Sequence, residues 1–188
     1  MLFSKRLFLE RYQDLHERII PNYIHTLGDK DMRSSVQNMN PIIWIYWHFI
    51  RTEDVGINRF IRNTPQLNVR FGPLMNADTT LNGTGMDKNE VIGMADGLSL
   101  NELKEYHLAV YQNTLLLLDE LELELLSETN SNEYIKKVIC EEKTMPESTW
   151  DLVELYYGKT KEWFLLHVCL THPFYHLGQI SMIRKLIA

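Results

Sequence analysis

The stretch WFLLHVCLTHPFYHLGQISMI, Trp163–Ile183, runs for 21 residues without an aspartate, glutamate, lysine or arginine. On length alone, such a run is long enough to cross a bilayer as a helix. It also holds His167, His172 and His176 among other polar side chains, and polar groups at this density are poorly tolerated in lipid. The sequence therefore predicts the innermost helix of a helical protein, not a membrane span.

The rest of the chain has few residues that break helices. Its 188 residues include 9 glycines and 6 prolines, a smaller share than in average proteins. An all-β fold would need turn residues about every dozen positions. With 45% hydrophobic and 23% charged residues, the composition is typical of a soluble globular chain with one core. We therefore expect a single all-α domain over residues 1–188.

Apolar periodicity and capping signals place the helices. We expect long helices over residues 5–27, 41–61, 100–121 and 160–186, and a shorter one over 150–157. Asn40 and Pro41 suit the N-cap and first position of the second helix. Ser99 and Glu102 have the spacing of a capping box for the third. The simplest arrangement of four long helices with few turns is an antiparallel four-helix bundle.

Seven of the fifteen Gly and Pro residues fall between positions 65 and 97. This clustering predicts one long loop, 65–98, between the second and third helices. Loops of this length are often lids or binding loops. A variable surface insertion is the alternative, and the sequence does not choose between them.

Charge and cysteine content restrict partners and location. The net charge of −6 repels phosphate backbones and argues against a nucleic-acid partner. Glu10 and Asp14 interrupt the first apolar residues, so we expect no signal peptide and a cytoplasmic protein. Cys140 and Cys169 form no CxxC motif and are expected to be free, reduced thiols.

Three histidines are candidates for one metal site. His172 and His176 lie one helical turn apart on one face, the spacing that lets two imidazoles bind one ion. Gln179 lies on the same stripe, and His48 has an inward, apolar setting on the second helix. Three neutral ligands leave coordination positions open, as in catalytic sites rather than closed structural ones.

Two strings of sequence resemble the motifs of the DinB-like superfamily of four-helix metalloproteins: PIIWIYWHFIRTED, 41–54, and HPFYHLGQI, 172–180. Members typically carry a WxxWHxxRxED-like motif on the second helix and HxxxHxGQ on the last. The matching positions here are Trp44, Trp47, His48, Arg51, Glu53, Asp54, His172, His176, Gly178 and Gln179. The loop at 65–98 and the third helix match only in general character.

The resemblance implies a divalent metal, most often zinc or nickel, held by His48, His172 and His176, frequently in a homodimer. Some members are S-transferases that use a low-molecular-weight thiol such as bacillithiol, mycothiol or glutathione, and one branch isomerises maleylpyruvate. We therefore expect an enzyme that acts on a small molecule. A metallohydrolase with the same site is one alternative. A non-catalytic dimeric stress-response or interaction bundle with a structural metal is the other.

Two residues depart from the pattern of the resemblance. Leu177 stands where many relatives have a basic residue, so an anion contact is missing. Pro173 follows His172 and disfavours α geometry there. We expect a kink that aims His172 at the metal, with displacement of His172 from the stripe as the alternative. His167 lies about 140° round a regular helix from His172 and is expected outside the pair.

Structural roles are expected for the other polar residues of the predicted helices. Arg51, Glu53 and Asp54 are expected in a surface or inter-helix ion pair, with a carboxylate that orients an imidazole as the alternative. His107 is expected to be a hydrogen-bonded core histidine. Neither the Glu-x-x-His of di-iron bundles nor HExxH occurs. No residue stands out as a catalytic base.

Overall fold

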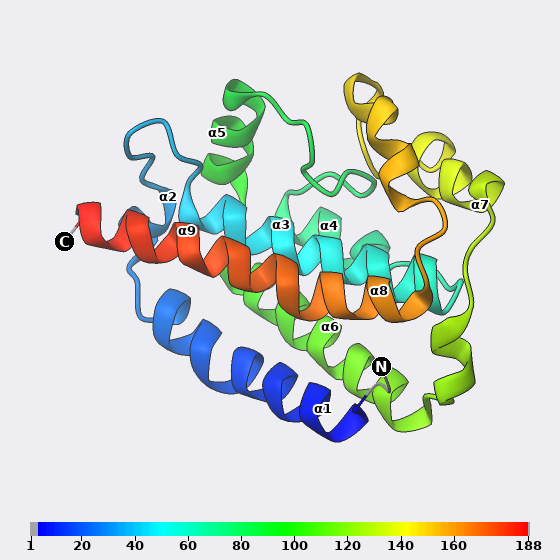
Figure 1. Cartoon of the computed structure of the whole chain (residues 1–188). Helices are drawn as coiled ribbons and strands as arrows, with labels where there is room; N and C mark the ends of the chain where they lie inside the picture. Colours follow the sequence, from blue (N-terminus) through cyan, green and yellow to red (C-terminus); the bar gives the residue numbers. More distant parts are fainter. Residues whose placement is uncertain (1–3, 188) are drawn as a thin grey trace.

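The computed structural model describes residues 4–187, and within that range it is all-helical, with no strand and one isolated bridge between Thr129 and Thr160. Its α-helices are α1 (Lys5–Gln13), α2 (Asp29–Arg33), α3 (Ile42–Val55), α4 (Asn68–Met75), α5 (Lys88–Gly97), α6 (Leu100–Glu120), α7 (Asn132–Lys136), α8 (Lys161–Leu166) and α9 (His172–Ile187) (Figure 1). No helix of this range combines the length and apolar character needed to cross a membrane.

Turns of π-helix extend several of these helices. They lie at Asp14–Ile19, Pro21–His25, Gly56–Ile61, Lys137–Glu141 and His167–Thr171. Helical structure is therefore continuous over 5–25, 42–61 and 161–187, close to three of the predicted segments. Pro21 does not split the first segment, because it stands at the start of a π-helical turn.

Two predicted helix starts are wrong in detail. Pro41 is itself the extended N-cap of α3, and no side chain caps that helix. The side chain of Ser99 makes no capping bond to α6. Its backbone N–H donates to the carbonyl of Met75, so the N–H that Glu102 would have to bind is already used. The shorter helix expected at 150–157 is a 3-10 helix, Glu147–Tyr156.

The single loop expected at 65–98 is also wrong, because this region contains α4 and α5. Asp87 and Glu90 form a capping box that starts α5. Several of the glycines and prolines that suggested a loop lie inside these two helices. Apart from residues 65–67 and 98, the irregular part is residues 76–87, which we call the docking loop.

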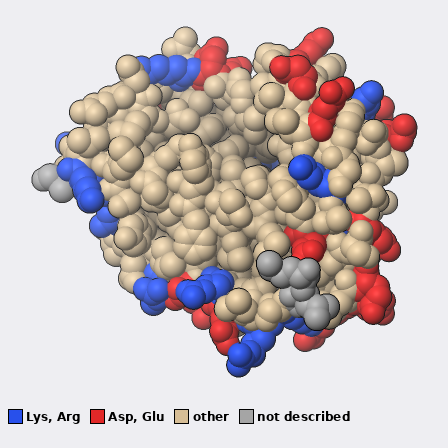
Figure 2. Space-filling view, in the orientation of Figure 1, with Lys and Arg blue, Asp and Glu red and all other residues tan. Residues whose placement is uncertain are grey.

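The innermost helix is α3, not the last helix as predicted. Every α3 residue except Thr52 is buried, and α3 packs against both α9 and α6. In contrast, Tyr175 and Met182 of α9 are 69% and 60% exposed. Figure 2 shows that the centre of the face crossed by α9 carries almost no charged side chains. The uncharged run at 163–183 is thus partly an uncharged surface.

Candidate metal centre

His48, His172 and His176 converge between α3 and the start of α9. One ring nitrogen from each lies within 4.8 Å of the others. The Nε2 atoms of His172 and His176 are 3.0 Å apart. Two nitrogens that bind one ion at about 2.0–2.1 Å stand roughly 3.0–3.4 Å apart. The spacing therefore fits a shared ion.

Hydrogen bonds fix two of the three rings with a lone pair facing inward. Nδ1–H of His48 donates to the carbonyl of Asn82 at 2.6 Å, and Nδ1–H of His176 donates to Oε1 of Gln179 at 2.8 Å. A neutral imidazole carries only one N–H, so neither Nε2 atom carries a proton, and each has a lone pair that can bind a cation. Outer partners of this kind are typical of metal-binding histidines.

Burial keeps these rings in the form that binds metal. It lowers the pKa of His48 to about 4, and the nearby His176 adds to the shift. Burial also lowers the pKa of His172 and of His176. All three rings are therefore neutral at pH 7, as metal coordination requires.

The π-helical turn before α9 decides how His172 is presented. Pro173 has no N–H to donate, and the backbone N–H of His172 reaches back five residues to the carbonyl of His167. His172 keeps ordinary α geometry, with φ −66° and ψ −49°, so the departure that we expected there does not occur. The wide turn also brings the rings of His167 and His172 to 5.7 Å, whereas a regular helix would separate them.

The docking loop lies directly on the His48 side of α3. Asn82 supplies the carbonyl that holds His48, and Gly83 follows with φ +95°. A Cβ on Gly83 would lie 2.8 Å from the Trp47 ring and 3.0 Å from Nδ1 of His48. Only glycine allows this backbone to approach so closely. This segment, which the sequence alone left open as a binding loop or a surface insertion, is therefore part of the site.

Arg51 attaches that segment to α3, and Asp54 attaches the start of α4. Arg51 donates from Nε to the carbonyl of Leu81 at 3.1 Å and from Nη2 to that of Thr80 at 2.7 Å. Asp54 accepts from the backbone N–H of Asn68, at the start of α4, at 2.8 Å. Both side chains are fully buried. Arg51 and Asp54 do form an ion pair, at 3.7 Å, but it is buried within α3, so the expected surface or inter-helix location is wrong.

Gly83→Ala is expected to lower the free energy of unfolding by about 2 kcal/mol, from the left-handed backbone and the overlap with Trp47. It should also weaken zinc binding about tenfold, because Asn82 no longer holds His48. Urea unfolding and zinc titration measure the two effects. Gly93→Ala is the matched control, since nothing lies within 4 Å of its added Cβ. Equal behaviour of the two variants would refute the role of Gly83.

A second buried polar chain crosses the space between α3, α6 and the first helical segment. Tyr46 OH lies 3.1 Å from Nε2 of His25 and 2.7 Å from Nδ1 of His107. Nε2 of His107 lies 2.7 Å from Nδ1 of His16, whose Nε2 is 3.5 Å from Oε2 of Glu53. His107 is a hydrogen-bonded core histidine, as predicted. The parts played by His16 and His25 had no signal in the sequence.

The carboxyl group of Glu53 lies at one end of this chain. Its Oε1 accepts from Tyr12 OH at 2.5 Å and from Thr114 at 2.7 Å. Burial raises its pKa to about 7, and the charge of Asp54 adds to the shift. Glu53 therefore does not pair on the surface, and the imidazole that it approaches is His16, outside the metal cluster.

Glu53→Gln is expected to become more stable relative to the natural protein as pH rises. A carboxyl whose folded pKa is raised to about 7 stabilises the fold fully below its unfolded pKa and loses that contribution as pH rises through 7. The difference in unfolding free energy should grow by roughly 3 kcal/mol between pH 4.5 and 8. Urea unfolding in the presence of a chelator measures it. Exposed Glu124→Gln controls for the lost charge, and a constant difference for Glu53→Gln would contradict the expectation.

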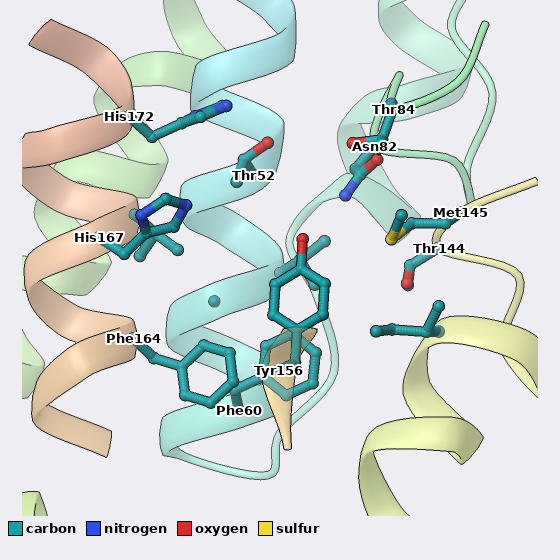
Figure 3. A pocket seen from close by; sticks show the side chains of 14 residues that line it. Thr52, Phe60, Asn82, Thr84, Thr144, Met145, Tyr156, Phe164, His167 and His172 are labelled. Carbon is teal, nitrogen blue, oxygen red and sulfur yellow. Dashed lines mark hydrogen bonds between the residues drawn. The ribbon is translucent and has the colours of Figure 1, made fainter. Parts of the chain in front are cut away.

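A cavity of about 140 Å³ adjoins the histidine cluster and shares His172 with it. Figure 3 shows His167 and His172 on one side, Asn82 and Thr84 on the other, and the ring of Tyr156 between them. The lining residues are Thr52, Val55, Gly56, Phe60, Asn82, Thr84, Ile139, Thr144, Met145, Tyr156, Phe164, His167, Val168 and His172. His167 and Tyr156 were not singled out as site residues from the sequence.

Comparison with known proteins supports the fold. The chain matches a crystal structure described as that of a conserved protein from Enterococcus faecalis, with a TM-score of 0.67 and 17% sequence identity. The match covers 99% of this chain and 98% of that one. At this identity the likeness concerns the fold alone. No protein-family model and no curated protein matches the chain.

Proposed function

We propose that the protein is a metal-dependent enzyme whose divalent ion is held by His48, His172 and His176. One observation carries the proposal: the three donor atoms converge at the wall of a cavity, because His172 belongs to both. An ion that only stabilises a fold is usually enclosed by four protein ligands. The described residues offer a cluster of three, which leaves room for a ligand from solution.

The proposed reaction is the transfer of a low-molecular-weight thiol to a small electrophile, with zinc or nickel as the metal. An ion held by three neutral imidazoles makes a bound thiol or water nucleophilic at neutral pH. The sulfur forms a bond to carbon while the leaving group departs with its bonding electrons, and the thiol proton goes to solvent. The DinB-like resemblance of the two histidine motifs favours the thiol over water.

In this proposal, residues of the chain orient the metal-binding imidazoles and enclose the cavity. Asn82 and Gln179 hold two imidazoles in the tautomer that binds a cation. Phe60 and Phe164 cover one end of the cavity and exclude water from it (Figure 3). Exclusion of water strengthens electrostatic interactions inside such a site.

The wider setting belongs to the same proposal. The resemblance implies an antiparallel four-helix bundle in one domain, and packing of α3 against α6 and α9 supports that arrangement. It also implies a homodimer. The net charge of −6 supports a protein that acts on a small molecule and not on nucleic acid, and we propose that it is cytoplasmic.

Two alternatives are separated by experiment. A metallohydrolase would use the same site with water in place of the thiol. A non-catalytic bundle with a structural metal is less well supported, because a cavity lies beside the cluster.

The test begins with element-specific metal analysis of protein purified without an affinity tag. The metal-loaded protein is then mixed with benzyl chloride, whose chloride is the leaving group, together with bacillithiol, mycothiol or glutathione in turn, and loss of free thiol is followed. We expect acceleration with at least one thiol, abolished by a chelator and by His176→Ala but retained in His25→Ala. Hydrolysis of 4-nitrophenyl acetate without thiol transfer would favour the hydrolase, and inactivity in both assays would refute an enzyme of either kind.

A further inference from the structure

The size of the cavity limits what it can enclose. At about 140 Å³ it is close to engineered cavities of about 150 Å³ that bind benzene. One six-membered ring with a short substituent fits this volume. A thiol the size of a tripeptide does not, so such a thiol would remain mostly outside.

The residues that line the cavity disfavour a charged ligand. None of the fourteen lining residues within the described part of the chain is an aspartate, glutamate, lysine or arginine. Lys159 lies outside the lining, with Nζ 5.4 Å from the centre of the Trp163 ring. Burial of an ionised group without a partner is costly. The cavity therefore favours an uncharged ligand.

One end of the cavity is built of flat aromatic faces. The rings of Phe60 and Phe164 are 4.5 Å apart and inclined by 20°, and those of Tyr156 and Phe164 are 6.2 Å apart and inclined by 8°. Nearly parallel rings offer a surface suited to a planar or compact apolar group.

The other end of the cavity offers an unpaired hydroxyl group. Figure 3 shows the hydroxyl of Tyr156 pointing away from Phe60 and Phe164, towards the space between Thr52 and Asn82. That hydroxyl has no hydrogen-bond partner among residues 4–187. Burial raises the pKa of Tyr156, so the O–H remains a donor. A carbonyl or ether oxygen on the ligand would accept this bond.

We propose that the cavity binds a small uncharged molecule with a compact apolar body and one hydrogen-bond acceptor. The body lies against Phe60 and Phe164, and the acceptor receives the hydroxyl proton of Tyr156 in a hydrogen bond. The role of this molecule as the electrophile rests on the proposed enzyme function. The binding itself does not, and it is tested without metal.

The test uses chelator-treated protein and three probes of similar shape: acetophenone, ethylbenzene and benzoate. Methyl NMR shifts locate binding, and we expect acetophenone to move the signals of Val55, Ile139 and Val168 but not Leu177, which borders a different groove. Acetophenone should bind at least tenfold more tightly than benzoate. Tyr156→Phe should weaken acetophenone about two- to tenfold and leave ethylbenzene unchanged.

Three results would overturn the proposal. They are binding of benzoate as tight as that of acetophenone, shifts centred on Leu177, and no binding of any probe. Because no metal is present, each can occur whether or not the metal-loaded protein transfers thiols. Unchanged acetophenone affinity in a folded Tyr156→Phe would remove the hydroxyl from the proposal.

Discussion

Arg51→Ala is expected to lower the free energy of unfolding by about 3–5 kcal/mol, which is a large part of the stability of a typical domain. The substitution leaves the fully buried Asp54 without the cation that lies 3.7 Å away. It also frees the carbonyls of Thr80 and Leu81, which accept from Arg51. Urea unfolding in the presence of a chelator measures the loss.

The contribution of a buried arginine to stability can be compared with that of an arginine in a surface ion pair. Arg62 pairs at 3.4 Å with the exposed side chain of Glu120, and such pairs contribute about 0–1 kcal/mol. Arg62→Ala is therefore the control. A loss below 1 kcal/mol for Arg51→Ala would show that burial of Arg51 does not matter to stability.

Arg51→Ala is also at risk of not folding, so a second variant keeps the test informative. Arg51→Met with Asp54→Asn removes both charges at similar volume and should recover part of the stability lost in Arg51→Met alone. In any folded variant that lacks Arg51, the docking loop loses its two anchors just before Asn82. Zinc affinity should then fall 10- to 100-fold, because His48 loses its outer partner.

Zinc is expected to stabilise the natural protein strongly and His176→Ala hardly at all. Binding to the folded state adds about 4 kcal/mol when free zinc is a thousandfold above the dissociation constant. Loss of one of three ligands removes most of that gain. Without metal, the variant should differ little in stability from the natural protein, because Nε2 of His176 faces that of His172 at 3.0 Å. Thermal unfolding with and without zinc measures the effect.

A histidine on the same helical segment provides the control for this experiment. His167 lies beside His172 but outside the cluster of three donors. His167→Ala should therefore keep the zinc-dependent stabilisation. Equal stabilisation of His176→Ala and the natural protein would refute the proposed ligand set.

Local sequence patterns predicted the part of the site that repeats along one helix. The i,i+4 spacing of His172 and His176, and the apolar setting of His48, indicated that these rings would meet, and the structure brings them together. The all-α class followed in the same way from periodicity and the scarcity of glycine and proline. Such signals are local, so they survive without knowledge of partners.

The partners of buried polar residues could not be predicted from such local patterns. Glu53 was expected in an ion pair, but it meets Tyr12 and Thr114, which lie 41 and 61 positions away. A polar side chain in a helix has the same sequence pattern whether it faces water or a distant donor. The π-helical turn that brings His167 beside His172 was missed for a related reason, since periodicity assumes a regular helix.

The sequence by itself determined the helical class and indicated three histidines as candidate ligands, two of them with metal-binding spacing. Only the tertiary structure decided that α3 is the innermost helix, that the docking loop holds His48 through Asn82, and that a small uncharged cavity adjoins His172. Helix formation depends on neighbours within about one turn, whereas burial of charge and the shape of a cavity depend on which distant segments pack together. That difference in range separates what could be predicted here from what had to be observed.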